Sequence, residues 1–376
     1  MRLLSFYKEK AMKSVMFVVS SMWIGGIQRV NAVLANELGK NNRVCLYSTM
    51  SKEESLYPLT VEHFKTDKDD PWSIKSIKLR IYGMLGLKFL VKKILINDSQ
   101  RLIQIIKDWK PETVVLNAEH ILYLPYLKEI FPEKKFIAWI HGSWNVYLNR
   151  VFFGIRTFLA KGLSMADVVL CLTSEDACVF SAYNKNTKVI YNPLTIENQT
   201  LANLDDKVIS WTGNLRHPVK GIDYLAEIAG KLPEDWKIAV AGGGDMKRLN
   251  RFIQKNHAEQ KVIVQGELSG DELHLHYLNS SLYLMTSRWE GFGLVLSEAM
   301  SYGLPILAFS QIGSREVLLE GKYGVLVENG NVDAMVEEIN RFIDSEELRK
   351  EYREKSLKRI GDFSLDKISS KWKKLI

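Results

Sequence analysis

One strand–turn–helix pattern constrains the fold more than any other part of the sequence. The apolar run Leu282–Met285 predicts a buried strand, and the helical spacing of apolar residues after position 293 predicts a helix. The turn between them contains two glycines around one phenylalanine, at 291–293. Glycine lets the backbone turn sharply and approach a ligand closely. Junctions of this kind are common in nucleotide-binding α/β proteins.

The turn before Leu294 predicts an anion site. The following helix presents unpaired N–H groups and the positive end of its dipole toward the turn, which suits phosphate. We therefore expect Phe292, Gly293 and Leu294 to line the site. Glu290 precedes the turn and Glu298 lies one turn into the helix, so both should face the same opening. Because a carboxylate repels phosphate, each is better suited to accept hydrogen bonds from sugar hydroxyls.

Short apolar strands alternate with helical patterns along the 376 residues, a length that suits two domains. This alternation predicts an α/β protein with two doubly wound, Rossmann-like parallel sheets that face a central cleft. The predicted strands lie at 15–20, 43–48, 113–116, 136–140 and 166–172, and at 208–211, 237–241, 262–265, 282–285, 306–309 and 324–327. Residues 189–193 are expected to close the first domain. Residues 50–72 are expected to be irregular. The polar segment 195–207 predicts a linker, so the domains are placed at 1–194 and 195–360, followed by a C-terminal helix at 361–376.

The first domain offers two candidate ligand contacts. The first predicted strand ends in a turn at Gly25 and Gly26 before a helical pattern begins, which is a possible phosphate or sugar contact. An ordinary tight turn is the alternative. His141 follows another predicted strand, at the C-terminal end where α/β proteins bind ligands. A histidine after a buried strand is also often structural, and the sequence leaves both interpretations open.

Arg216 and Lys220 are candidate phosphate ligands of the second domain. They are four residues apart, beside two glycines, in a loop between a strand and a helix. Arginine can contact two phosphate oxygens at once, and lysine adds a point charge, so the pair suits a diphosphate. Surface charge is the alternative for a loop arginine and lysine considered alone.

The net charge of +7 is concentrated in residues 1–200, which hold 27 Lys and Arg against 18 Asp and Glu. A basic half suggests an anionic partner, and no nucleic-acid partner is expected. Segment 73–97 carries six cations and no acid among many apolar residues, a pattern typical of an amphipathic element on an anionic membrane surface. Segment 147–163 is a second candidate. A core helix with a solvated lysine face is the alternative.

Other patterns bear on location and metals. No uncharged apolar run is long enough to span a membrane, and the apolar segment 14–24 lacks a cleavage pattern, so a strand is expected there. Cys45, Cys171 and Cys178 lack metal-binding spacing and are expected to be reduced, buried thiols. Acidic residues at 67–70 imitate a D-x-D metal motif without a flanking strand, so we expect a solvated loop and no metal. The expected location is the cytoplasm, peripheral to the inner face of the membrane.

Residues 290–305, EGFGLVLSEAMSYGLP, resemble the signature of the retaining glycosyltransferases of family 4, which have the GT-B fold. Glu290 and Glu298 match the E-x7-E pair of that family. The resemblance is strong over residues 206–330. The first domain matches only in Gly25–Gly26, in His141 and in strand order.

The resemblance implies roles for the charged candidates. Arg216 and Lys220 would clamp the pyrophosphate of a nucleotide-sugar. Glu290 would hold hydroxyls of the donor sugar, and Glu298 would hold the ribose hydroxyls. His141 would lie near the anomeric centre of the transferred sugar.

The resemblance also implies roles for backbone groups. Gly25 and Gly26 would approach the donor diphosphate from the first domain. Gly243 lies in a loop that would adjoin the nucleotide, and the loop of Gly266 would recognise the base through its backbone. The C-terminal helix would cross back to the first domain.

A protein with these features would be a metal-independent, retaining hexosyltransferase without a cofactor. It would move a sugar from a UDP-sugar to a glycan or lipid-linked acceptor in cell-surface polysaccharide synthesis. A non-catalytic GT-B subunit that binds nucleotide-sugar or supports a partner enzyme is the alternative, as is an epimerase or phosphorylase of the same fold. A Rossmann oxidoreductase is disfavoured because no G-x-G-x-x-G follows the first predicted strand.

Overall fold

The computed structural model describes residues 12–23, 25–66, 72–196, 198, 200–216 and 218–376. The chain forms two compact units. Unit 1 contains Met1–Cys171, Cys178–Lys188 and Ser369–Ile376, and unit 2 contains Leu172–Ala177 and Val189–Ile368. The acidic loop expected at 67–70 lies outside the described residues.

Unit 1 is built on a seven-stranded sheet in the order β3-β2-β1-β4-β5-β6-β7. Its strands are β1 (Ser14–Val19), β2 (Arg43–Ser48), β3 (Glu62–Lys65), β4 (Thr113–Asn117), β5 (Lys135–Trp139), β6 (Val168–Cys171) and β7 (Thr187–Val189). Neighbouring strands from β3 to β6 are parallel. The central strands β1 and β4 are buried almost throughout, as expected for a parallel sheet covered on both faces.

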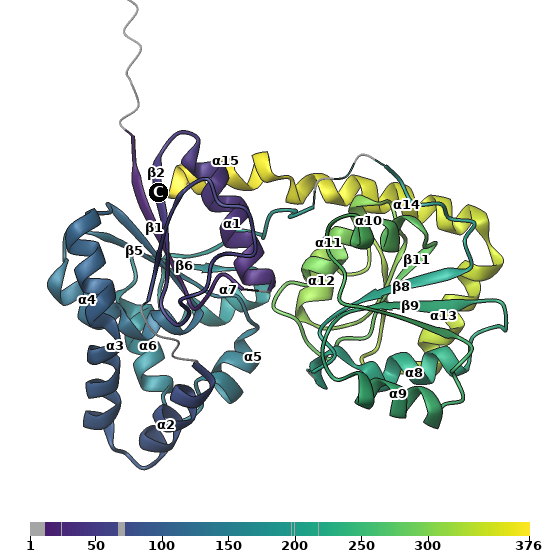
Figure 1. Ribbon diagram of the computed structural model, residues 1–376, viewed down its shortest axis with the longest axis horizontal. Helices are drawn as coiled ribbons and strands as arrows, with labels where there is room; N and C mark the ends of the chain where they lie inside the picture. The colour runs from purple at the N-terminus through teal and green to yellow at the C-terminus, as the bar shows by residue number, and fades with distance from the viewer. Residues whose placement is uncertain (1–11, 24, 67–71, 197, 199, 217) are drawn as a thin grey trace, which may run out of the picture. The chain divides into compact units, whose positions relative to one another are not determined.

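The helices of unit 1 connect these strands. They are α1 (Gly26–Gly39), α2 (Trp72–Met84), α3 (Lys88–Trp109), α4 (Leu124–Ile130), α5 (Trp144–Val146) and α6 (Arg156–Met165), with a 3₁₀ turn η1 (Ala118–Tyr123) and a π turn η2 (Tyr147–Val151). In Figure 1, α4 lies beside α3 and α6, and α2 and α3 form a long hairpin that extends away from the sheet.

The end of the chain completes the core of unit 1. The last turns of α15 (Leu365–Leu375) belong to this unit. Trp372 is fully buried there, and its ring centroid lies 4.8 Å from that of Trp139 and 5.7 Å from that of Phe17. Lys373 Nζ lies 3.2 Å from a carboxylate oxygen of Glu37 on α1. The N-terminal sheet is therefore covered in part by the last residues of the sequence.

Unit 2 has a six-stranded parallel sheet in the order β10-β9-β8-β11-β12-β13. Its strands are β8 (Val208–Thr212), β9 (Lys237–Ala241), β10 (Val262–Gly266), β11 (Leu282–Met285), β12 (Ile306–Phe309) and β13 (Val325–Val327). Its helices are α8 (Ile222–Gly230), α9 (Met246–Lys255), α10 (Gly270–Leu278), α11 (Leu294–Ser301), α12 (Ile312–Leu318), α13 (Val332–Asp344) and α14 (Glu346–Ile360), with 3₁₀ turns η3 (Pro218–Lys220) and η4 (Gly361–Phe363). In Figure 1, α8 and α9 cover one face of the sheet, and α11 and α14 cover the other.

A short segment from the middle of the sequence also packs with unit 2. The helix α7 (Ser174–Phe180) begins in this unit. The Glu316 carboxylate on α12 accepts hydrogen bonds from the backbone N–H of Ser174 at 2.8 Å and from its hydroxyl at 3.0 Å. Tyr191 Oη donates to the same carboxylate at 2.7 Å. The Glu316 carboxylate thus holds two neighbouring parts of the chain in place.

The predicted fold class is confirmed in its two parallel-sheet, Rossmann-like α/β units. Apolar runs located most of the strands to within two residues. Strand β3 was not predicted, because Glu62–Lys65 is a short, half-exposed edge strand with two charged residues. The expectation of three buried cysteines is wrong for Cys178, which is exposed.

Each of the two segments expected at a membrane surface contains a break. Segment 73–97 contains two helices, α2 and α3, instead of one element, because the chain turns at Gly86 with φ +71°. Segment 147–163 is interrupted between η2 and α6, where Gly154 adopts φ +85°. Positive φ angles suit glycine and end a right-handed helix.

Candidate functional site

The turn between β11 and α11 has the geometry of an anion site. Gly293 is the N-terminal cap of α11 and has φ +89°, a conformation that favours glycine. A Cβ at this position would also lie 3.1 Å from Met285 Cε. The N–H groups in the first turn of α11, beginning with Leu294, face the turn, as phosphate binding at a helix N-terminus requires.

Glu290 and Lys220, predicted from separate motifs, contact each other directly. Lys220 Nζ lies 2.6 Å from Glu290 Oε1, and Ser287 Oγ donates a hydrogen bond to the same oxygen at 2.7 Å. The lysine and glutamate side chains are only 19% and 15% exposed. An ammonium group and a carboxylate therefore lie side by side, mostly out of water, at the turn before α11.

Two residues of the next loop hold the Glu290 turn in place. Gln311 Oε1 accepts hydrogen bonds from the backbone N–H of Glu290 at 3.0 Å and of Gly313 at 2.8 Å. A Cβ on Gly313 would lie 2.8 Å from the carbonyl oxygen of Phe292, so the two loops touch along their backbones. Neither contact was predicted, because Gln311 lacks a motif of its own.

The loop that carries Lys220 is fixed against the same turn. The Thr286 hydroxyl donates to the carbonyl oxygen of Lys220 at 2.7 Å. Gly221 has φ +64°, and a Cβ there would lie 2.1 Å from the carbonyl oxygen of Thr286. Arg288 forms two hydrogen bonds to the Asp223 carboxylate, at 2.9 and 2.6 Å. The backbone position of Lys220 is thus determined by several independent contacts.

Arg216 lies in the same loop but in a different environment. Its side chain is exposed, and its backbone N–H donates to Asn214 Oδ1 at 2.9 Å. A Cβ on Gly244 would lie 2.8 Å from the backbone nitrogen of Arg216, so the loop rests on the one after β9. Lys220 is therefore the buried cation of this loop and Arg216 the exposed one. Residue 217 lies outside the described residues.

Glu298 is almost fully buried on α11, with 5% exposed. Tyr277 Oη donates to Glu298 Oε2 at 3.2 Å, and Thr195 Oγ1 donates to Oε1 at 3.3 Å. Burial, reinforced by the Glu298 carboxylate, raises the pKa of Tyr277 well above its ordinary value, so the hydroxyl remains a donor. The orientation of Glu298 is set by hydroxyls that the sequence did not reveal.

The side chain of Phe292 is not available to a ligand. It is 3% exposed and packs against Tyr191 and Phe363, with ring centroids at 5.7 and 5.5 Å. The expectation that Phe292 lines the site therefore applies to its backbone only.

Gly243 and Gly266 lie in loops that are bonded to one another. Leu215 N donates to the carbonyl oxygen of Gly243 at 2.9 Å, and Gly242 N donates to that of Gly266 at 2.6 Å. Gly266 has φ +79°. The loops after β8, β9 and β10 thus meet at the carboxyl ends of the strands, where parallel α/β sheets bind ligands.

The substitution Gly242→Ala is expected to disturb the contact between these loops, although Gly242 was not among the predicted site residues. A Cβ at Gly242 would lie 1.8 Å from the carbonyl oxygen of Gly213, so the two loops must separate. We expect a loss of about 2 kcal/mol in the free energy of unfolding. Denaturant unfolding measures this loss. Gly361→Ala is the control, since its Cβ would meet open space, and equal behaviour of the two variants would contradict the prediction.

His276, next to these loops, is buried in its neutral form. Its Nδ1 lies 2.6 Å from Gln265 Oε1, which can only accept, so Nδ1 carries the proton and Nε2 accepts from the Ser210 hydroxyl at 2.7 Å. Burial lowers the pKa of His276 to about 4. The side chain is 3% exposed.

The stability of unit 2 is therefore expected to fall in mild acid. The folded-state pKa of His276 lies below the unfolded value of about 6.5, so its contribution is complete above that pH and is lost toward about pH 4. For this residue alone, the free energy of unfolding should be about 2 kcal/mol lower at about pH 5 than at about pH 8. Denaturant unfolding at both values, in wild type and His276→Gln, measures the difference. An unchanged pH dependence in the variant would contradict the assignment.

In unit 1, the glycine turn is braced by a tyrosine. Gly25 N donates to Tyr57 Oη at 3.0 Å, and Tyr57 Oη donates to the carbonyl oxygen of Gly25 at 3.2 Å. Helix α1 begins at Gly26, so the turn leads into a helix N-terminus as predicted. Tyr57 lies in the segment that was expected to be irregular.

His141 joins a buried amide network at the ends of β4 and β5. Its Nε2 lies 2.5 Å from Asn117 Oδ1, while Asn117 Nδ2 donates to the carbonyl oxygen of Val18 at 2.9 Å and to Asn31 Oδ1 at 3.1 Å. Since Asn117 Oδ1 is an acceptor, Nε2 carries the proton and Nδ1 holds a lone pair. Burial lowers the pKa of His141 to about 3, so the ring is neutral at physiological pH.

Within the described ranges, no group of three or more His, Cys, Asp or Glu side chains is arranged to hold a metal ion. None of the helices in those ranges has both the length and the apolar character needed to cross a bilayer.

Comparison with known proteins identifies relatives of the chain. Residues 194–359 match the family described as glycosyl transferases group 1. An uncharacterized glycosyltransferase of Haemophilus influenzae is 26% identical over 97% of this chain and 100% of its own length. The amylovoran biosynthesis glycosyltransferase AmsD of Erwinia amylovora is 25% identical over 94% of this chain and 96% of its own.

Solved structures share the fold over nearly the whole chain. The lipopolysaccharide outer core galactosyltransferase WaaB superposes with a TM-score of 0.71 at 21% identity, over 96% of this chain and 98% of its own. HepE of Anabaena, in complex with UDP and glucose, gives a TM-score of 0.76 at 18% identity, over 97% of this chain and 99% of its own. Residues 194–359 are therefore similar to the glycosyl transferases group 1 family, and the chain shares its two-unit α/β fold with solved glycosyltransferases.

Proposed function

We propose that the protein is a retaining, metal-independent glycosyltransferase of family 4 that moves a hexose from a UDP-sugar to a glycan or lipid-linked acceptor. The observation that carries the proposal is the Lys220–Glu290 pair beside the first turn of α11. It combines a cation, a helix N-terminus and a carboxylate at adjoining positions. A diphosphate needs the first two, and sugar hydroxyls need the third.

The reacting bond joins the anomeric carbon to a phosphate oxygen. When it breaks, both bonding electrons stay on the diphosphate, and the sugar becomes oxocarbenium-like. Lys220 Nζ and the N–H groups of α11 would stabilise the negative charge, and the exposed Arg216 would contact the same phosphates. Phosphates that attract Lys220 would release Glu290 to accept hydrogen bonds from the donor sugar.

The buried Glu298 suits the ribose of the nucleotide. Its carboxylate is held by Tyr277 and Thr195 and so is preorganised to accept from further hydroxyls. The loops of Gly243 and Gly266 would receive the nucleoside through their backbones. A UDP donor is supported by the UDP and glucose in the HepE structure, and by a relative named as a UDP-N-acetylglucosamine–peptide transferase subunit, 35% identical over 36% of this chain.

Unit 1 is proposed to take the acceptor. Neutral His141 would accept a hydrogen bond at Nδ1 from a sugar hydroxyl. In the turn at Gly25 and Gly26, Gly26 would offer its backbone N–H to phosphate, because the Gly25 N–H already donates to Tyr57. Retention would follow if the acceptor oxygen attacks the anomeric face that the diphosphate leaves, with the acceptor proton passing to a departing phosphate oxygen. The names AmsD and WaaB, an amylovoran and a lipopolysaccharide enzyme, support an acceptor in cell-surface polysaccharide synthesis.

We also propose a cytoplasmic protein held peripherally at the inner face of the membrane by segments 73–97 and 147–163. These segments contain α2, the start of α3, and the region of η2 and α6. Lipid-linked acceptors are confined to such a surface, so the attachment would bring the enzyme to its acceptor.

The test is the release of nucleoside diphosphate from a panel of nucleotide-sugars, with and without a chelator. We expect slow hydrolysis of a UDP-sugar that survives chelation, and a product with the donor's anomeric configuration. Glu298→Gln should lose the preference for ribose over 2′-deoxyribose nucleotides, while the exposed control Glu259→Gln should keep it. Nucleotide binding without any turnover would favour the non-catalytic subunit.

A further inference from the structure

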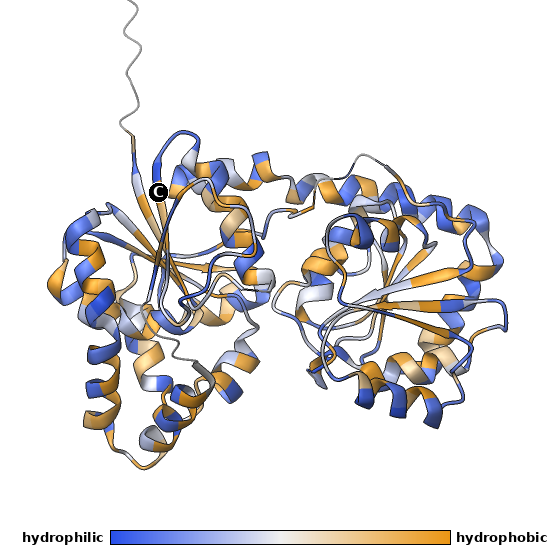
Figure 2. Ribbon diagram, viewed as in Figure 1, coloured by the Kyte–Doolittle hydropathy of each residue, from blue (hydrophilic) through white to orange (hydrophobic). Residues whose placement is uncertain are grey.

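Helix α2 presents its apolar stripe to solvent. Residues at spacings of three and four along it, continuing around the turn into α3, are exposed large hydrophobics: Ile74, Ile77, Ile81, Met84, Leu85 and Phe89. Leu85 and Phe89, at the end of the hairpin, are each 67% exposed. Figure 2 shows hydrophobic segments alternating with hydrophilic ones along both helices. A surface helix ordinarily turns such a stripe inward, so this stripe calls for a partner.

The same hairpin is basic on its exposed faces. Lys78, Lys88, Lys92 and Lys93 are exposed, and segment 73–97 contains no acid. Apolar side chains at the tip with cations around them form the pattern of an element that enters the boundary of an anionic bilayer.

The second segment expected at a membrane lies against this hairpin. A Cβ on Gly83 would lie 2.1 Å from the carbonyl oxygen of Gly154, and Arg80 Nη1 donates to the carbonyl oxygen of Arg150 at 3.2 Å. Phe153, beside this contact, is 47% exposed. We call the exposed apolar residues of α2, the turn and Phe153, together with the surrounding cations, the hairpin surface. Two separate sequence predictions therefore describe one surface.

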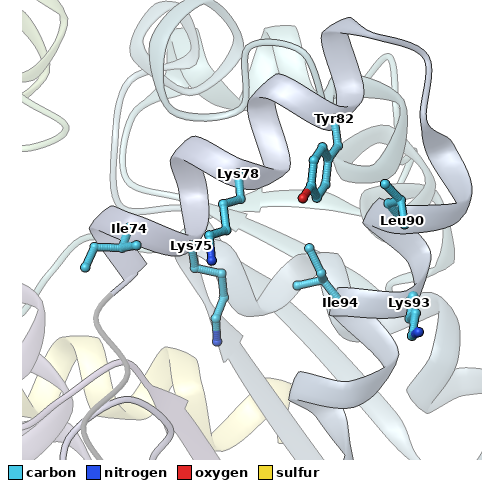
Figure 3. A pocket seen from close by; sticks show the side chains of 7 residues that line it. All are labelled: Ile74, Lys75, Lys78, Tyr82, Leu90, Lys93 and Ile94. Atoms are coloured by element: carbon cyan, nitrogen blue, oxygen red, sulfur yellow. The ribbon is translucent and has the colours of Figure 1, made fainter.

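A pocket of about 340 Å³ opens between α2 and α3. Figure 3 shows Lys78 and Tyr82 extending from α2 and Leu90 and Ile94 from α3, with Lys93 at one side. Tyr82, Leu90 and Ile94 are half-buried, whereas the two lysines are exposed. The pocket thus combines apolar walls, one phenolic hydroxyl and two cations.

Lys75 also lines the pocket, but its charge is already compensated. Its Nζ lies 3.0 Å from Asp98, with both side chains largely buried. Among the described residues, no acid lies within ion-pair distance of Lys78 or Lys93. The excess charge of the pocket therefore belongs to these two lysines.

We propose that the hairpin surface docks on an anionic lipid bilayer and that the pocket between α2 and α3 holds the phosphate of one lipid headgroup. This inference rests on the proposed membrane location and assigns a binding site to it. The phosphate oxygens pair with Lys78 and Lys93 and accept from Tyr82, and the upper acyl chains lie along Leu90 and Ile94. The apolar tip at Leu85 and Phe89 enters the headgroup boundary.

Charge favours a bilayer over a second copy of the chain. Two copies joined through the hairpin surface would bring their cations together, which like-charge repulsion opposes. An anionic bilayer attracts each of these cations and also accepts the apolar tip. The positive charge of the hairpin surface therefore favours a bilayer over a second copy of the chain.

Binding to vesicles tests the docking surface. We expect the full chain to sediment with vesicles of phosphatidylcholine and phosphatidylglycerol at low salt, and not with phosphatidylcholine alone. Leu85→Ser with Phe89→Ser should weaken binding by at least about tenfold, because the two apolar side chains that enter the headgroup boundary are removed. Both residues are exposed, so thermal unfolding should not change. Self-association that this double variant abolishes, without vesicle binding, would overturn the proposal in favour of a second copy.

Three variants test the pocket itself. Lys78→Gln with Lys93→Gln should weaken binding about 30-fold, against almost no change for the exposed control pair Lys107→Gln with Lys185→Gln. Tyr82→Phe removes the hydroxyl, and Ile94→Phe fills part of the pocket, while every charge is kept. Wild type should prefer phosphatidylglycerol to an equal surface charge from oleate, and Tyr82→Phe and Ile94→Phe should reduce that preference.

The outcomes separate this inference from the proposed function. Equal binding to phosphatidylglycerol and oleate vesicles would overturn the headgroup pocket and leave peripheral attachment standing. No binding to any anionic vesicle would overturn both the pocket and the membrane location. Hydrolysis of UDP-sugar in solution should be unchanged in all hairpin variants. Absence of this hydrolysis in the wild type would contradict the proposed function and would leave the vesicle result standing.

Discussion

Lys220→Met is expected to lower kcat for sugar transfer by about 10²–10³-fold, because a preorganised charge that meets the departing diphosphate is lost. In the wild type, Lys220 Nζ lies 2.6 Å from the mostly buried Glu290 carboxylate. The same substitution removes this cation and leaves the carboxylate without it. We therefore also expect a loss of about 2 kcal/mol in the free energy of unfolding of unit 2. Steady-state kinetics and denaturant unfolding measure the two effects.

The double variant Lys220→Met, Glu290→Gln separates these effects. Removing both charges should recover most of the stability, since no unpaired charge remains, while transfer stays as slow as in the single variant or slower. Lys231→Met is the matched control, because Lys231 pairs with Asp333 at the surface, where the side chains are 40% and 82% exposed. Activity restored in the double variant would mean that Lys220 only neutralises Glu290, and the proposed role at the diphosphate would fail.

Trp372→Ala is expected to cost about 4 kcal/mol in the stability of unit 1, because it removes a fully buried indole from the sheet core. The lost contacts include those with Trp139 and Phe17. Hydrogen–deuterium exchange should show faster exchange in β1 and β5, with β11 and β12 of unit 2 much less affected.

Two further substitutions on α15 bracket this prediction. Lys374→Ala, at an exposed position of the same helix, should leave exchange unchanged. Trp372→Phe should cost less than about 1.5 kcal/mol, because most apolar contact is kept and the indole N–H has no hydrogen-bond partner among the described residues. If Trp372→Ala behaved like Lys374→Ala, the C-terminal helix would not be part of the core of unit 1.

The strands and the main glycine turn could be predicted because their signals are local. An apolar run such as Leu282–Met285 between polar segments marks a buried strand, and the glycines around Phe292 mark the turn. The Lys220–Glu290 contact joins residues far apart in the sequence, and only the resemblance to a family brought them together. Gln311, Tyr277 and their hydrogen bonds to the site had no local signal at all.

The turn between α2 and α3 could not be located from the sequence. Composition indicated that segment 73–97 is basic and rich in apolar residues, but periodicity could not locate the turn at Gly86. A single glycine within an apolar run is compatible with a continuous helix or with a break. Which outcome occurs depends on tertiary contacts, such as the close approach of Gly83 to Gly154.

The contribution of the last eight residues to the N-terminal sheet has a consequence for protein synthesis. Trp372 follows all of unit 2 in the sequence, so unit 1 lacks part of its interior until unit 2 has been translated. Unit 2 begins later yet has all of its residues once Ile368 has been made. The second half of the polypeptide should therefore reach its native state first, and a nascent chain stalled shortly before residue 369 should carry a protease-sensitive N-terminal half.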